Sequence, residues 1–95
     1  MVNKMVNKKA DSEMIDELYS LIVSLDNKDD CKALFEDLCT FKEIEQMAQR
    51  IKAAKLLLQG YTFNQITDEV DISSATLSRV SRCVRYGSGY KNILK

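Results

Sequence analysis

The segment 62–85 constrains the fold most, because it carries the signals of two short consecutive helices. Thr62 is followed three residues later by Gln65, and this pair is typical of a capping box that starts a helix at residue 63. Ile66 and Val70 lie four residues apart and therefore share one face of that helix. The spacing predicts a short amphipathic helix that ends near residue 70.

A second helix is expected after a turn at Asp71. Ser73 or Ser74 can cap it, and the apolar residues that follow recur at the three- and four-residue spacing of a helix. The residues expected to pack this helix against the first are Ile72, Leu77, Val80 and Val84. Two short helices joined by a tight turn predict a helix-turn-helix.

The outer face of the second helix combines small side chains, hydroxyl groups and a guanidinium. Small residues let a helix backbone approach base edges, hydroxyls hydrogen-bond to any base, and arginine can bind guanine through two hydrogen bonds. The residues of this face are Ser74, Ala75, Thr76, Ser78 and Arg79. This chemistry favours a helix that reads DNA, although spacing alone also allows a helical hairpin with a solvated polar face.

Charge is unevenly distributed along a chain whose formal net charge is zero. Residues 1–40 carry five basic and nine acidic side chains, whereas residues 41–95 carry nine basic and five acidic ones. Residues 72–95 contain five basic side chains and no Asp or Glu. A basic end attracts phosphates and supports DNA binding, although an ordinary solvated face can have the same composition.

Composition bounds the fold class and argues against catalysis. The 95 residues include no Pro, only 3 Gly and 45% hydrophobic residues, which predicts one all-α domain with short connections. There is no His, and no phosphate-binding loop or nucleophile motif, so we expect neither an enzyme nor a cofactor. The cysteines Cys31, Cys39 and Cys83 form no CxxC pair, so we expect buried thiols and no metal site.

The N-terminus is polar and aperiodic. Residues 1–10 include three lysines and predict a flexible arm, which is either loose or in contact with phosphates. This start lacks the apolar centre of a signal peptide, and no apolar run reaches the roughly 20 residues that a membrane span requires. We therefore expect a cytoplasmic protein without a membrane partner.

Two amphipathic helices are expected between this arm and residue 40. The first, over residues 12–25, has acidic residues in its first turn and apolar residues at helical spacing. These apolar residues are Ile15, Leu18, Ile22 and Leu25, with Met14 and Leu21 beside them. The second begins near Asp29 and ends at Thr40, with an apolar stripe of Cys31, Leu34, Phe35 and Leu38.

A longer helix is expected over residues 41–59. Thr40 and Glu43 form a second capping box, and Gly60 is typical of a helix end. Its expected apolar stripe is Ile44, Met47, Ala48, Ile51, Ala54, Leu57 and Leu58. Because this stripe and those of the first two helices exceed what the pair at 62–85 can cover, we expect a homodimer with a largely shared core.

The order of these elements and three short motifs resemble the Trp repressor family, and in particular its branch of uncharacterised repressor-like proteins. The resemblance covers about residues 14–85, and its most specific parts are residues 45–51 (EQMAQRI), 57–60 (LLQG) and 75–79 (ATLSR). Members are intertwined all-helical dimers with a helix-turn-helix near the C-terminus. The resemblance implies this fold for residues 11–86, followed by a C-terminal tail at 87–95.

The resemblance also implies a pocket for an effector. In the tryptophan-dependent members, the amino acid is held by residues that match Thr40, Arg50, Thr76 and Arg79. Val80 replaces a Gly against which the indole lies, and Cys83 replaces a Ser. Because a branched side chain would partly fill the slot, at a cost of roughly 1–3 kcal/mol for overpacking, we expect DNA binding without tryptophan or with another effector. A surface ion pair at Arg50 and a helix cap at Thr40 are the alternatives.

The DNA contacts implied by the resemblance extend the outer face described above. The family's base-facing positions match Ser74, Ala75 and Ser78, and its flanking phosphate contacts match Asn64, Thr67 and Arg82. Phe63 replaces a polar residue that approaches the DNA backbone, so the operator of the tryptophan-dependent members does not carry over. The sequence therefore predicts a DNA-binding transcriptional regulator, acting as a repressor. The alternative is a protein-interaction module with a solvated basic helix.

Overall fold

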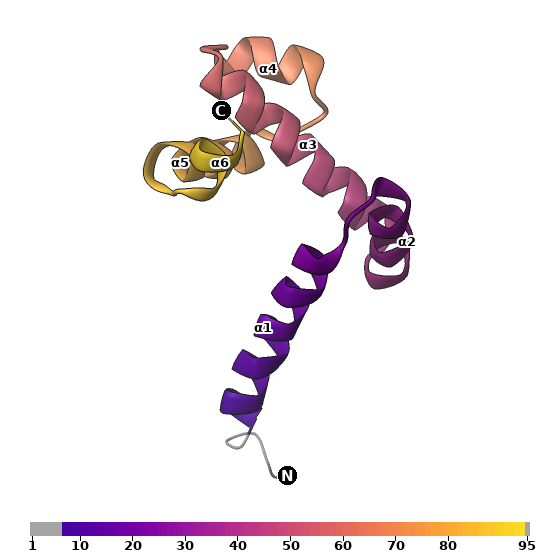
Figure 1. Ribbon diagram of the computed structural model, residues 1–95. Helices are drawn as coiled ribbons and strands as arrows, with labels where there is room; N and C mark the ends of the chain where they lie inside the picture. The colour runs from indigo at the N-terminus through magenta and orange to yellow at the C-terminus, as the bar shows by residue number, and fades with distance from the viewer. Residues whose placement is uncertain (1–6, 95) are drawn as a thin grey trace. The chain divides into compact units, whose positions relative to one another are not determined.

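The computed structural model describes residues 7–94, with side chains from residue 11 onward. Over this range the chain forms helices and no strand, which confirms the all-α expectation (Figure 1). The helices are α1 (Asn7–Ser24), α2 (Lys28–Leu38), α3 (Phe41–Leu58), α4 (Phe63–Glu69), α5 (Ser74–Tyr86) and α6 (Gly89–Ile93). None of them combines the length and apolar character needed to cross a membrane. The chain divides into two compact units between Leu38 and Cys39. They are here called the N-terminal and C-terminal units.

The N-terminal unit contains α1 and α2. Helix α1 begins at Asn7 instead of residue 12, so residues 7–10 of the expected irregular arm are helical, and residues 1–6 lie outside the described range. Helix α2 is preceded by Asn27, whose Oδ1 accepts a hydrogen bond from the backbone N–H of Asp30 at 2.7 Å. None of the described side chains of α1 and α2 is fully buried within this chain.

Helices α3, α4 and α5 begin at the capping residues expected from sequence. Thr40 Oγ1 accepts from the N–H of Glu43 at 3.1 Å, and Glu43 Oε1 accepts from the N–H of Thr40 at 2.8 Å. Thr62 and Gln65 make the same reciprocal pair at 3.2 and 2.8 Å. Ser73, one of the two expected candidates, caps α5 by accepting from the N–H of Thr76. Each capping pair satisfies backbone groups that have no partner inside the helix.

A glycine with positive φ ends α3. Gly60 has a φ of +92° and follows the C-cap residue Gln59. The N–H of Gly60 donates to the carbonyl of Leu57, and the N–H of Tyr61 donates to that of Leu56, both at 3.0 Å. These two bonds define a Schellman motif, in which glycine avoids the strain of a left-handed backbone. The turn returns the chain so that α4 packs against α3 (Figure 1).

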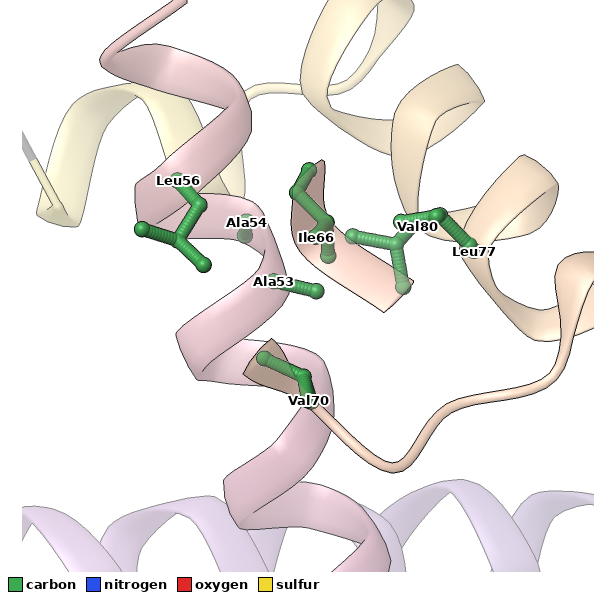
Figure 2. Packing of buried hydrophobic residues seen from close by; sticks show 7 residues of the cluster. All are labelled: Ala53, Ala54, Leu56, Ile66, Val70, Leu77 and Val80. Atoms are coloured by element: carbon green, nitrogen blue, oxygen red, sulfur yellow. The ribbon is translucent and has the colours of Figure 1, made fainter. Parts of the chain in front are cut away.

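The core of the C-terminal unit lies where α4 and α5 meet α3. The expected residues Ile66, Val70, Leu77 and Val80 are buried, with Ile72 and Val84 partly buried beside them. Helix α3 contributes Ala53, Ala54 and Leu56, and in Figure 2 the Ala53 side chain points toward Ile66 and Val80. Two fully buried alanines allow the helices to approach closely, because they add little bulk at the contact.

The apolar stripe expected on α3 is partly covered within this chain. Ala54 of that stripe is buried, Ile44, Met47 and Leu57 are half-buried, and Ala48, Ile51 and Leu58 are exposed. Helix α3 also buries Ala53 and Leu56, which lie outside the expected stripe. Periodicity predicts the longer apolar face of α3 and does not indicate these two core residues.

The segment expected to be a C-terminal tail is part of the C-terminal unit. Residues 89–93 form α6, which packs against α3 and α5, with Tyr90 and Leu94 partly buried against the core. Lys91 Nζ donates to the carbonyl of Arg85 at 3.2 Å and so joins α6 to the end of α5. The sequence of this segment indicates only a tail, because five helical residues are too few to show an apolar period.

The three cysteines are free thiols, as expected, but Cys31, Cys39 and Cys83 are half-buried instead of buried.

Candidate nucleic-acid interface

The helix-turn-helix is built from α4, residues 70–73 and α5. Helix α4 ends at Val70, whose backbone is extended with φ −122° and ψ 132°. Ser73 is also extended, and its hydroxyl donates to Thr76 Oγ1 at 3.0 Å while accepting from the N–H of Thr76 at 3.1 Å. These bonds fix the first turn of α5, while Leu77 and Val80 hold the helix on the core.

The outer face of α5 carries the residues expected to contact bases. Ser74, Ala75 and Ser78 are exposed and lie at helical spacing, so they share one face. Arg79 and Arg82 are exposed on the same side of the helix, whereas Thr76 is half-buried next to the turn. In the described part of the chain, the salt bridges are Lys32–Glu36 and Lys42–Glu45, and neither involves an arginine of α5.

The two expected phosphate contacts on α4 are both exposed. Asn64 and Thr67 lie three residues apart and are therefore neighbours on the surface of α4. The Thr67 hydroxyl donates to the carbonyl of Asn64 at 3.1 Å, so its hydrogen is engaged within the helix. It must rotate before it can donate to a phosphate, which makes Thr67 a weaker donor than Asn64 or Arg82.

A hollow of about 250 Å³ lies between the start of α4 and the second half of α5. Its lining consists of Phe63, Ser78, Ser81, Arg82, Arg85 and Tyr86. The Arg85 guanidinium carbon lies 6.0 Å from the centroid of the Tyr86 ring, at the outer limit of a cation–π contact. The sequence reasoning did not select Ser81, Arg85 or Tyr86. Their presence on one face could have been predicted from the spacing of Ser78, Ser81, Arg82 and Arg85, because residues three and four apart are neighbours on a helix.

A second, polar cleft of about 290 Å³ lies between the first half of α3 and the turn of the helix-turn-helix. Its lining consists of Lys42, Gln46, Gln49, Arg50, Asp71, Ile72, Ser73 and Thr76. Arg50 and Thr76 are the two residues of the expected effector pocket that this cleft brings together. The salt bridges found among the described residues do not include Arg50.

The other residues of the expected effector pocket lie in different surroundings. Thr40 is the cap of α3, Val80 is 1% exposed within the core, and Arg79 is exposed on the outer face of α5. Cys83 lines an apolar hollow with Ile51 and residues of α6. One protomer therefore assembles only part of the pocket that the resemblance implied.

Between residues 7 and 94, no three His, Cys, Asp or Glu side chains are grouped so that they could hold a metal ion.

An all-helical fold whose second half is a capped helix-turn-helix places the protein among helix-turn-helix proteins. The sequence pattern of the Trp repressor protein family matches residues 13–95, and the chain belongs to that family. This family consists of regulators and not of enzymes, which confirms the expectation of a protein without catalytic activity.

Individual relatives agree with this assignment. The chain is 43% identical over 74 residues to the uncharacterized protein YerC of Bacillus subtilis (strain 168), covering 78% of this chain and 71% of that protein. A crystal structure of a candidate Trp repressor from Staphylococcus aureus matches with a TM-score of 0.84 and 40% identity, over 93% of this chain and 89% of that one. A TrpR-like protein from Eubacterium eligens ATCC 27750 matches with a TM-score of 0.83 and 36% identity, over 92% and 91%.

Proposed function

We propose that this protein is a sequence-specific DNA-binding regulator that represses transcription as a homodimer. The observation that carries this proposal is the outer face of α5, where exposed small and hydroxyl residues are followed by arginines outside the salt bridges of the described residues. Membership of the Trp repressor family supports the same function. A repressor needs only to occupy DNA, and this chain offers one compact surface suited to that task.

The outer face of α5 separates base reading from phosphate binding. Ser74, Ala75 and Ser78 leave the first half of the helix slim enough to approach base edges in the major groove. Arg79 is the candidate for two hydrogen bonds to a guanine, and Arg82 lies one turn closer to the C-terminus, where it would meet the backbone. This division predicts different consequences when either arginine is replaced.

Exposed apolar residues on α1 and α3 support a homodimer. Helix α1 exposes Ile15, Leu18 and Leu21, and α3 exposes Ile51 and Leu58. Large exposed apolar surfaces mark interaction sites, and a second copy of the chain offers the same surface in return. In a homodimer, the two α5 helices would enter successive major grooves about 34 Å apart on a pseudo-palindromic site.

Val80 supports regulation without tryptophan. Its side chain is 1% exposed and lies among the core residues contributed by α3 and α4. An aromatic ring stacked on α5 at this position would have to displace a packed side chain. Isothermal calorimetry should therefore detect no binding of L-tryptophan in the micromolar range, and saturable binding in that range would contradict this part of the proposal.

Selection from genomic DNA tests sequence-specific binding directly. Purified protein is mixed with sheared genomic DNA at near-physiological salt, with and without L-tryptophan, and the retained fragments are sequenced. We expect a few fragments that share a two-fold motif in both arms. Enrichment only with tryptophan would show that Val80 permits the effector. No enrichment in either arm would contradict DNA binding and favour the protein-interaction module.

Two arginine variants test the roles within α5. Arg79→Ala should cost about 1–3 kcal/mol on the selected site and relax specificity at one base position. Arg82→Ala should weaken binding to all sequences alike and lower the salt slope by about one, because the variant neutralises one phosphate fewer. Lys52→Ala is the matched control, because Lys52 is an exposed cation of α3 outside both roles. Equal, small effects of all three variants would indicate a solvated face.

A further inference from the structure

The hollow lined by Phe63, Ser78, Ser81, Arg82, Arg85 and Tyr86, here called the arginine hollow, combines hydrogen-bond donors with aromatic rings. Five of its side chains, all except Phe63, can donate hydrogen bonds from hydroxyl or guanidinium groups, and none of the six carries a carboxylate. Two of the six are aromatic and stand on different helices, Phe63 on α4 and Tyr86 on α5. Such a surface suits an anionic group that has apolar atoms next to it.

The charge in the arginine hollow is not balanced by its own lining. Arg82 and Arg85 bring two guanidinium groups to one space of about 250 Å³. Their mutual repulsion falls when an anion lies between them, and guanidinium groups bind phosphate oxygens in pairs. The Ser78 and Ser81 hydroxyls line the same space and can supply further donors.

We propose that the arginine hollow holds one phosphate of the DNA backbone beside each reading helix. Arg82 and Arg85 are the cationic donors, the two serines add hydroxyl donors, and the aromatic rings pack against the adjacent sugar. The proposal rests on the proposed function and extends it to Ser81, Arg85, Phe63 and Tyr86.

The position of the hollow on α5 favours DNA over a free phosphate. Ser78 belongs both to the base-facing positions and to the hollow, so the two surfaces are continuous. Arg85 lies seven residues further along, or about 10 Å at 1.5 Å per residue. That distance is close to the roughly 12 Å width of the major groove. A helix that places Ser78 near base edges therefore brings Arg85 to the backbone that borders the groove.

The test asks whether the loss of affinity caused by replacing Arg85 depends on the charge of one particular phosphate. The two-fold fragment recovered from genomic DNA is synthesised with one neutral methylphosphonate per half-site, at each position in turn, and binding is measured by fluorescence anisotropy. With wild-type protein, several positions should lower affinity, and the position whose phosphate lies in the hollow should lower it about tenfold. At that position Arg85→Ala should cause no further loss, whereas on unmodified DNA the same variant should bind about tenfold more weakly than wild type.

The same experiment contains its controls. Lys52→Ala removes one exposed cation outside the hollow, and its effect should add to that of a methylphosphonate at every position. Arg85→Gln keeps a polar side chain and should behave like Arg85→Ala. Circular dichroism of each variant shows whether it is folded. If the effects of Arg85→Ala also add at every position, the hollow does not hold a phosphate although DNA binding stands. If wild-type protein binds no DNA, both proposals are overturned.

A second arm separates the DNA backbone from a small phosphorylated ligand. The protein is titrated with inorganic phosphate and with a deoxymononucleotide, without DNA, and binding is followed by NMR. We expect no saturable binding at millimolar concentration. Saturable binding of either small ligand would overturn the proposal if Arg85→Ala abolishes it and leaves the affinity for DNA unchanged. The hollow would then be a site for a free ligand.

Discussion

Helices α1 and α5 both carry apolar residues at helical spacing, but their surroundings differ. Leu77 of α5 is 0% exposed, whereas on α1 Leu18 is 37% and Ile15 is 52% exposed. The C-terminal unit closes a core of its own from α3, α4 and α5, and the N-terminal unit buries no described side chain fully. Apolar spacing thus shows that a face requires cover, but it does not show whether the same chain supplies that cover.

The largest effect is expected from a charge on the uncovered face of α1. In Leu18→Asp, a carboxylate replaces an apolar side chain of the stripe that we assign to the dimer interface. Burying it would cost several kcal/mol, so the dimer should weaken roughly a hundredfold or more, and DNA binding should fall with it. Analytical ultracentrifugation measures the monomer–dimer equilibrium.

Val23→Asp is the control for this comparison. Val23 is 82% exposed and lies on the side of α1 away from the Leu18 stripe. The same charge there should leave the dimer intact. A Leu18→Asp protein that remains dimeric would show that α1 lies outside the interface and that the exposed apolar residues serve another partner.

Truncation of a leucine in each unit gives the next largest effect. Leu77→Ala leaves a cavity in a closed core and should lower the free energy of unfolding by about 2–5 kcal/mol. This decrease should be the same at low and high protein concentration, because the core lies within one chain. Leu18→Ala should instead destabilise more strongly at low concentration. Urea unfolding at two protein concentrations measures both, and a concentration-independent Leu18→Ala would contradict a shared core.

Sequence reasoning succeeded where the signal was local. Thr40 and Thr62 are predicted as caps from neighbouring residues and Ser73 is one of two predicted candidates, and the structure shows the hydrogen bonds of all three. Leu77 and Val80 were assigned to the core because a helix-turn-helix must pack its second helix against its first. Such inferences need no knowledge of distant segments.

Sequence reasoning failed where two faces of one element compete. Helix α3 has apolar residues around most of its circumference, so periodicity did not distinguish the face of Ala53 and Leu56 from the face of Ile51 and Leu58. The expected effector pocket remains a prediction, and one protomer brings only part of it together. Thr76 and Cys83 lie on α5 seven residues apart but line different hollows, because α6 packs beside the end of the helix.

Substitutions of two glycines test whether α6 contributes to the stability of the C-terminal unit. A Cβ on Gly87 would lie 2.7 Å from the carbonyl oxygen of Cys83, so Gly87→Ala must shift the end of α5 or α6. We expect a decrease of about 1–3 kcal/mol in the free energy of unfolding. At Gly89 a Cβ would meet nothing within 4 Å, so Gly89→Ala should be neutral or slightly stabilising. Thermal unfolding measures both, and equal effects would indicate that α6 contributes little.

The smallest expected effect compares one cap from each unit. Thr62→Ala removes the cap of α4, and Asn27→Ala removes the acceptor at 2.7 Å from the N–H of Asp30 at the start of α2. Removal of a cap costs about 1 kcal/mol when the helix is part of the cooperative fold. If the dimer unites the two units, both substitutions should lower the free energy of unfolding by this amount in urea titrations. If only Thr62→Ala does so, α2 unfolds independently of the rest of the protein. The N-terminal unit would then remain less stable than the C-terminal unit even in a dimer in which a second copy covers α1.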